Sequence, residues 1–235
     1  MSERRNTRHL VVNGDDLGMS SGVNRGIVEA HRHGILTSAS LMVDRPAAQE
    51  AAVLARALPT LSVGLHLELE REAGTQVRAA MRDQLDRFER LMGRLPSHVD
   101  SHRDVHRYAD VLPHAQELAL GLDVPLRGHS PVRCVTVFYG QWAGEDHPEQ
   151  VSVESLIRIL GGEVGDGVTE IVCHPGYADP PLGSSYASVR EAELHTLCDP
   201  RVAEFLIRAR IQLANFCDLR KVFTVESYRA EPPPE

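Results

Sequence analysis

The chain has 235 residues, of which 42% are hydrophobic and 25% are charged. A chain of this size and composition can bury a full core, which excludes a disordered, fibrous or membrane-spanning protein. The net charge of −8 argues against a nucleic-acid-binding face, because such domains usually carry a basic excess. We therefore expect one globular domain that binds neither nucleic acid nor membrane.

The cysteines and the N-terminal residues indicate a cytoplasmic protein. The four cysteines form no CxxC pair, as is typical of a reducing compartment. The apolar run that follows Arg8 covers only residues 10–12, which is too short for the apolar part of a signal peptide. We expect flexible ends at residues 1–7 and 226–235, the latter with the sequence AEPPPE, around a single domain over residues 8–225.

In chain order, strand-like runs alternate with runs of helical spacing. Strands are expected at residues 9–13, 38–43, 61–69, 98–101, 125–127, 168–174 and 212–215, and helices at residues 23–33, 47–58, 76–95, 111–122, 152–160, 188–197 and 201–209. Such alternation predicts parallel strands with helices packed outside. An open doubly wound sheet has the same pattern, but about seven strands of this length favour a closed or nearly closed barrel. The predicted fold is a distorted single-domain (β/α) barrel of the α/β class.

Asp and His residues recur where the apolar strands end. They are Asp15 and Asp16 in VVNGDDLG, His66 in VGLHLEL, Asp100, His102 and Asp104 at alternating positions in VDSHRDVH, and His174 in EIVCHPG. In parallel barrels the active site lies at the C-terminal ends of the strands. Alternate side chains of a strand point to one face, so we expect these groups to converge on a metal site or an acid–base site.

Two histidines and one carboxylate form a ligand set that leaves open positions on a divalent ion. Adjacent carboxylates such as Asp15 and Asp16 repel each other when ionised, and a cation would explain why they are tolerated. Each motif also has a structural interpretation, since Asp-Asp-Leu-Gly is typical of a turn or helix cap and His66 of a hydrogen-bonded core histidine. The coincidence of all four strand ends favours the functional interpretation.

Four motifs are the stretch from VVNGDDLG to TSASLMV, VGLHLEL, PSHVDSHRDVH and EIVCHPGY. In order and spacing they resemble those of the YdjC-like carbohydrate deacetylases, which include the chitooligosaccharide deacetylases. The resemblance covers residues 8–218. It implies a distorted (β/α) barrel whose metal site is related to that of the polysaccharide deacetylases. It also implies one divalent ion, removal of acetyl groups from an N-acetylated amino sugar or glycoconjugate, and a fold compatible with a homodimer.

Carried over residue by residue, the resemblance implies a role for each motif. Asp16, His66 and His102 match the metal ligands, Asp15 the general base, His174 the general acid or oxyanion-stabilising group, and Arg127 the basic residue that orients the base or the substrate. Further candidates for substrate contact are Glu68, Asp100, Asp104 and Tyr177, and exposed aromatic residues such as Phe138, Tyr139 and Trp142 could stack on sugar rings. Mixed nitrogen and oxygen ligands suit Zn²⁺ best, with Mg²⁺, Mn²⁺ and Co²⁺ as alternatives.

Two departures from the family leave the substrate open. Asp104 stands where the family often has a histidine, so it is expected to contact the sugar, to be an extra metal ligand or to support His102. Relatives commonly carry a long loop where only a few residues follow Glu70 here, which indicates a more open site, a larger substrate or a partner subunit that closes it. A metal-dependent phosphoesterase on a similar barrel and a non-catalytic sugar-binding relative remain alternatives, whereas the α/β alternation argues against a non-haem iron oxygenase.

Overall fold

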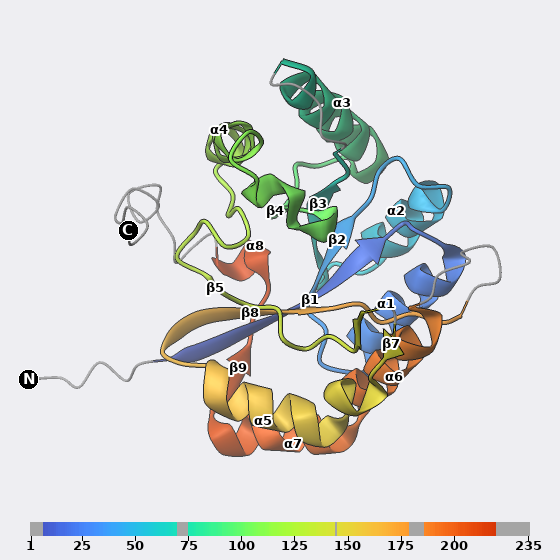
Figure 1. The fold of residues 1–235 in the computed structure, drawn as a ribbon, viewed down its shortest axis with the longest axis vertical. Coiled ribbons are helices and arrows are strands. Elements are labelled where there is room, and N and C mark those ends of the chain that lie inside the picture. The colour runs from blue at the N-terminus through green and yellow to red at the C-terminus, as the bar shows by residue number, and fades with distance from the viewer. Residues whose placement is uncertain (1–6, 70–74, 144, 179–185, 220–235) are drawn as a thin grey trace, which may run out of the picture.

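The computed structural model describes residues 7–69, 75–143, 145–178 and 186–219, and its centre is a curled sheet (Figure 1). The sheet has seven strands in the order β4-β3-β2-β1-β8-β5, with β9 paired to the start of β1. These strands are β1 (Arg8–Leu17), β2 (Ser38–Leu41), β3 (Ser62–Leu67), β4 (Val99–Ser101), β5 (Arg133–Val135), β8 (Gly167–Cys173) and β9 (Ile211–Leu213). All of their pairings are parallel. The prediction of parallel strands in a distorted barrel is confirmed.

Helices surround the curled sheet on its outside (Figure 1). The α-helices are α1 (Ser21–His33), α2 (Ala48–Arg56), α3 (Thr75–Met92), α4 (Leu112–Leu122), α5 (Val153–Glu163), α6 (Ala187–Cys198), α7 (Pro200–Ala209) and the short α8 (Phe216–Leu219). Two 3-10 segments, η1 (His102–Arg107) and η2 (Pro148–Val151), and an antiparallel ribbon of β6 (Gln141–Trp142) and β7 (Glu145–Asp146) complete the described elements. The seven longer helices match the helices that the sequence predicts.

The apolar pattern explains the central strand and the helix that follows it. In β1, which pairs with β8 along one edge and with β2 and β9 along the other, Leu10, Val11 and Val12 are all fully buried, so both faces of the strand are covered. A strand covered on both faces is apolar without alternation. In α1, Val23 and Ile27 lie one turn apart on the buried face, and the Ser20 hydroxyl accepts the Val23 N–H at the helix start.

The strand expected at residues 125–127 is wrong. Leu126 makes only an isolated parallel bridge to Val99. The chain then turns at Gly128, whose φ of 70° lies in the left-handed region that favours glycine, so the pairing cannot continue. The bridge still holds Arg127 beside β4, since its N–H donates to the Val99 carbonyl at 3.0 Å.

The alternation expected through VDSHRDVH also stops early. β4 ends at Ser101, and the chain enters η1, in which Arg103 has φ 57° and Asp104 has φ 53°. A left-handed turn of this kind redirects the side chains that follow it. The expectation that Asp104 shares one strand face with Asp100 and His102 is therefore wrong.

No helix within the described ranges is long and apolar enough to cross a bilayer. The predictions of flexible ends at residues 1–7 and 226–235 and of a short connection after Glu70 fall outside the described residues, apart from Thr7. The single domain over residues 8–225 stays a prediction.

Candidate metal and acid–base site

A distortion at the end of β1 brings two adjacent carboxylates into one cluster. Neighbouring residues of a regular strand point to opposite faces. Here the register of β1 against β2 shifts between Gly14 and Leu17, and Asp16 has φ 69°. Asp tolerates this left-handed backbone better than most residues. As a result, Asp15 reaches Arg127 while Asp16 reaches His66.

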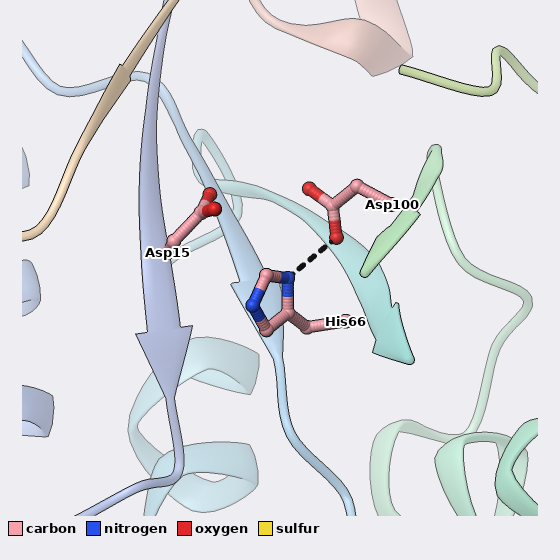
Figure 2. Close-up of side chains that lie close together, drawn as sticks. All are labelled: Asp15, His66 and Asp100. Atoms are coloured by element: carbon pink, nitrogen blue, oxygen red, sulfur yellow. Dashed lines mark hydrogen bonds and ion pairs between the residues drawn. The ribbon is translucent and has the colours of Figure 1, made fainter. Parts of the chain in front are cut away.

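His66, on β3, is the centre of the cluster. Its side chain is 1% exposed, with Nδ1 2.7 Å from Oδ1 of Asp100 and Nε2 3.5 Å from Oδ1 of Asp16. Figure 2 shows Asp15 of β1 and Asp100 of β4 on either side of this imidazole. Burial lowers the pKa of His66, but the carboxylates of Asp100 and Asp15 outweigh burial and raise it well above its usual value. The cluster therefore has an excess of negative charge that favours a cation.

Two ligand sets share His66. Asp15, His66 and Asp100 each offer one ligand atom, and these atoms lie within 4.8 Å of one another. However, Nη2 of Arg127 lies 2.7 Å from Oδ1 of Asp15 and 2.6 Å from Oδ2 of Asp100, so a guanidinium already supplies the positive charge between them. On the other side, Oδ1 of Asp16 is buried and accepts no hydrogen bond among the described residues. An unpaired buried carboxylate oxygen facing Nε2 of His66 fits a metal ligand better.

His102 stands beside this second set. It is the first residue of η1, and its ring centroid lies 6.0 Å from that of His66. Burial lowers the pKa of His102 more than the nearby Asp16 raises it, which favours the neutral imidazole that binds metals. The structure thus brings together Asp16, His66 and His102, the residues that match the metal ligands of the family, and their role as ligands stays a prediction.

Asp15 is held from three directions by N–H donors. Arg127 donates from Nη1 to Oδ2 and from Nη2 to Oδ1, both at 2.7 Å. Asn13, two residues earlier on β1, donates from Nδ2 to Oδ1 at 2.8 Å. Charge-assisted bidentate pairing of this kind fixes the orientation of a carboxylate. Arg127 is therefore placed where it can orient Asp15, one of the two roles that the resemblance implies for it.

His174 follows β8, and two charged residues of α6 connect it to the cluster. Arg190 of α6 donates from Nη2 to Oδ2 of Asp16 at 2.5 Å and from Nη1 to the His174 carbonyl at 3.3 Å. Glu193 of α6 accepts the His174 backbone N–H at 2.5 Å and lies 4.0 Å from its Nδ1. The ring of Tyr139, 39% exposed, lies edge-on 5.7 Å from the imidazole. These contacts join His174 to the Asp16 side of the cluster.

Sequence reasoning missed Arg190 and Glu193. Both are almost completely buried, yet they lie on a helix whose charged residues resemble a solvated face in the sequence. Only the packing of α6 against α1 and against the segment that follows β8 turns them inward. No local motif distinguishes them from exposed helical charges.

The residues proposed for substrate contact already have partners within the protein. Asp100 is 0% exposed beneath His66, so it belongs to the cluster but has no surface to offer a sugar. The other three pair with nearby groups: Glu68 with Arg45 at 2.5 Å, Asp104 with Arg107 at 3.5 Å, and the Tyr177 hydroxyl with Glu29 at 2.5 Å. Among the aromatic candidates, Phe138 is buried in the core, whereas Trp142 is exposed and stacks on His147 in the region of the β6–β7 ribbon.

Comparison with known proteins identifies the family. The sequence model of the YdjC-like protein family matches residues 9–75 and 70–208. The chain belongs to the YdjC-like family. It is 35% identical to a carbohydrate deacetylase of Geobacillus stearothermophilus, over 92% of this chain and 99% of that protein. A chitooligosaccharide deacetylase of Serratia marcescens is 31% identical, over 89% of this chain and 98% of that protein.

The fold agrees with this assignment. A crystal structure from Enterococcus faecalis V583, of a candidate cellobiose-phosphate cleavage protein, matches with a TM-score of 0.80 and 27% identity. The match covers 91% of this chain and 99% of that one. The resemblance of the sequence motifs to the YdjC-like family is therefore confirmed.

Proposed function

We propose that this YdjC-like protein is a metal-dependent carbohydrate deacetylase that hydrolyses the acetamido group of an N-acetylated amino sugar or glycoconjugate. The carbohydrate deacetylases and the chitooligosaccharide deacetylase among its relatives support this reaction. The observation that carries the proposal is Oδ1 of Asp16, which is buried, accepts no hydrogen bond among the described residues and lies 3.5 Å from Nε2 of His66, beside a second carboxylate that Arg127 holds in place.

Asp16, His66 and His102 would hold the ion. This set of one carboxylate and two imidazoles suits Zn²⁺ by softness, and Mg²⁺, Mn²⁺ and Co²⁺ are the alternatives. When bound, a divalent ion supplies a Lewis acid that polarises the acetyl carbonyl and lowers the pKa of water. Arg190 would keep the second oxygen of Asp16 engaged, so that only Oδ1 is free to ligate.

Asp15 and His174 would carry the proton transfers. Asp15 takes a proton from the attacking water while Arg127 and Asn13 hold its carboxylate. The amide C–N bond then breaks, and His174 gives a proton to the departing nitrogen, which leaves acetate and the free amino sugar. The exposed ring of Tyr139, next to His174, would pack against the sugar.

The test is acetate release from a panel of N-acetylated sugars, with metal-stripped protein and after addition of each of the four ions. We expect acetate only with metal. Asp15→Asn should lower turnover by about 10²- to 10⁴-fold, the usual contribution of a general base, while its metal affinity is retained. Asp16→Ala should lose metal binding and activity together.

Two results would contradict this proposal. If Asp16→Ala binds metal as tightly as the wild-type protein, the ligand assignment is wrong. If the wild-type protein binds one metal ion but releases no acetate from any sugar, the reaction is wrong, and phosphate esters should be assayed as substrates of the alternative phosphoesterase.

We also propose a cytoplasmic location and a homodimer. All four cysteines are free thiols, which suits a reducing compartment. The homodimer rests on the family resemblance. Cell fractionation tests the location, and light scattering of the purified protein tests the oligomeric state.

A further inference from the structure

Asp100 is a fully buried carboxylate whose two oxygens are both engaged. Oδ1 lies 2.7 Å from Nδ1 of His66. Oδ2 accepts from the Ser40 hydroxyl at 2.5 Å and lies 2.6 Å from Nη2 of Arg127. Asp100 and His66 are directly paired across β4 and β3, so the backbone fixes their approach. An ionised carboxylate in this setting has no free oxygen with which to meet a substrate.

The contact with His66 determines which imidazole nitrogen faces Asp16. A carboxylate that receives a guanidinium N–H is an acceptor, so Nδ1 of His66 must carry the proton that it donates to Asp100. When His66 is neutral, its lone pair is then on Nε2, the nitrogen 3.5 Å from Oδ1 of Asp16. Without Asp100, either nitrogen could carry the proton and the ring could rotate. Partners of this kind orient and strengthen a ligating imidazole.

Arg127 extends the effect of Asp100 to the other side of the cluster. Its Nη2 contacts Oδ1 of Asp15 at 2.7 Å as well as Oδ2 of Asp100 at 2.6 Å. A third carboxylate, Glu170, accepts from Nε of Arg127 at 2.9 Å. Asp100 is therefore one of three anchors that hold the guanidinium, and the guanidinium in turn holds Asp15.

We propose that Asp100 is the positioning residue of the metal centre: it fixes His66 for metal binding through Nδ1 and shares Arg127 with the general base. This inference rests on the proposed function, because it assigns His66 as a ligand and Asp15 as the base. It differs from the expectation that Asp100 contacts the sugar. It also differs from a ligand set of Asp15, His66 and Asp100, in which Asp100 would bind the ion itself.

The test compares Asp100→Asn with the wild-type protein by calorimetric titration of metal-stripped samples with Zn²⁺ and Co²⁺. Asn keeps the shape but removes the charge and leaves a weaker acceptor for Nδ1–H. We expect the metal dissociation constant to rise by about 10- to 100-fold. The Co²⁺ absorption spectrum should also change, since it reports the orientation of the ligands. The sugar KM should change less than kcat, because Asp100 does not reach the substrate.

Controls separate positioning from folding. Asp110→Asn alters an exposed aspartate in the segment after η1, and its metal affinity should equal that of the wild-type protein. Ser40→Ala leaves the Asp100 carboxylate in place and removes its hydroxyl donor, together with the contacts of that hydroxyl with Asn13 and His98, so it should weaken metal binding by less than Asp100→Asn does. Should Asp100→Asn fail to fold, Ser40→Ala alone decides, and an unchanged affinity in this variant would overturn the inference.

The remaining outcomes distinguish the inference from the proposed function. Wild-type affinity in a folded Asp100→Asn would overturn the positioning role. If Asp15→Asn and Asp100→Asn both abolish binding, Asp100 is a ligand in the alternative set. If the wild-type protein binds metal but releases no acetate, the proposed reaction fails while the weaker binding of Asp100→Asn still supports the positioning role. A wild-type protein that binds none of the ions overturns both.

Discussion

Glu170 is predicted to make stability depend on pH in a way that a single substitution removes. This residue of β8 is 2% exposed and accepts from Arg127, which Asp15 and Asp100 also engage. Burial raises the pKa of Glu170, Arg127 lowers it, and the two aspartates raise it again, with the net result of about 7 against an ordinary value of 4.5. Near neutral pH, the carboxyl group of Glu170 is therefore only partly ionised.

Folding favours the protonated form of Glu170, so this residue makes the protein less stable as the pH rises. The contribution of Glu170 to stability is fully present below about pH 4.5, the unfolded pKa, and is lost as the pH rises through about 7, the folded pKa. At about 1.4 kcal/mol per pKa unit, the loss totals about 3 kcal/mol. Between pH 5 and pH 9 we expect the free energy of unfolding to fall by about 2–3 kcal/mol on account of Glu170, because part of the total loss has already occurred at pH 5.

The assay is urea denaturation of the wild-type protein and Glu170→Gln from pH 5 to pH 9 in the presence of a chelator. Gln has the size of the protonated side chain and does not titrate. The stability of Glu170→Gln relative to the wild-type protein should therefore increase with pH by the amount above. Glu204→Gln, at an exposed site on α7, should show no such trend. Parallel pH curves for the wild-type protein and Glu170→Gln would refute the reasoning.

Two further substitutions test the packing around the site. Arg127→Met leaves the carboxylates of Asp15 and Glu170 buried without their cation. The free energy of unfolding, measured by urea denaturation, should therefore fall by about 3–5 kcal/mol at pH 8 and by less at pH 5. An equal loss at both pH values would contradict this. Gly26→Ala would place a Cβ 2.4 Å from the Gly176 Cα, so α1 and the segment after His174 must separate. Its melting temperature and acetate release should both fall, and an unchanged activity would show that His174 does not depend on this contact.

Most of the fold could be predicted from the sequence because its long elements have clear periodicity. The buried strands β1 and β8 contain short apolar runs, β3 alternates in strand fashion, and helices such as α1 repeat apolar residues at one-turn spacing. Short elements such as β5, β6 and η1 have too few residues for a pattern to emerge. The segment at residues 125–127 looked like a strand, but a turn at Gly128 limits it to one bridge.

The candidate ligands could be named from the resemblance of the sequence motifs to the family, but their partners could not. Strand ends in a parallel sheet meet at one edge, so the clustering of Asp16, His66 and His102 follows from topology once the alternation is recognised. Arg190 and Glu193 have no such signal, since a charged residue on a helix becomes a buried partner only through the packing of that helix.

The sequence by itself determined the parallel α/β architecture, the family and the residue types at the strand ends, because these depend on local periodicity and on motif order. Only the tertiary structure decided how the charges are shared. A single guanidinium from Arg127 holds Asp15 and Asp100, and the left-handed backbone at Asp16 leaves one of its oxygens facing His66. These features depend on distances between strands far apart in the chain, and such distances are set by packing and not by the order of residues.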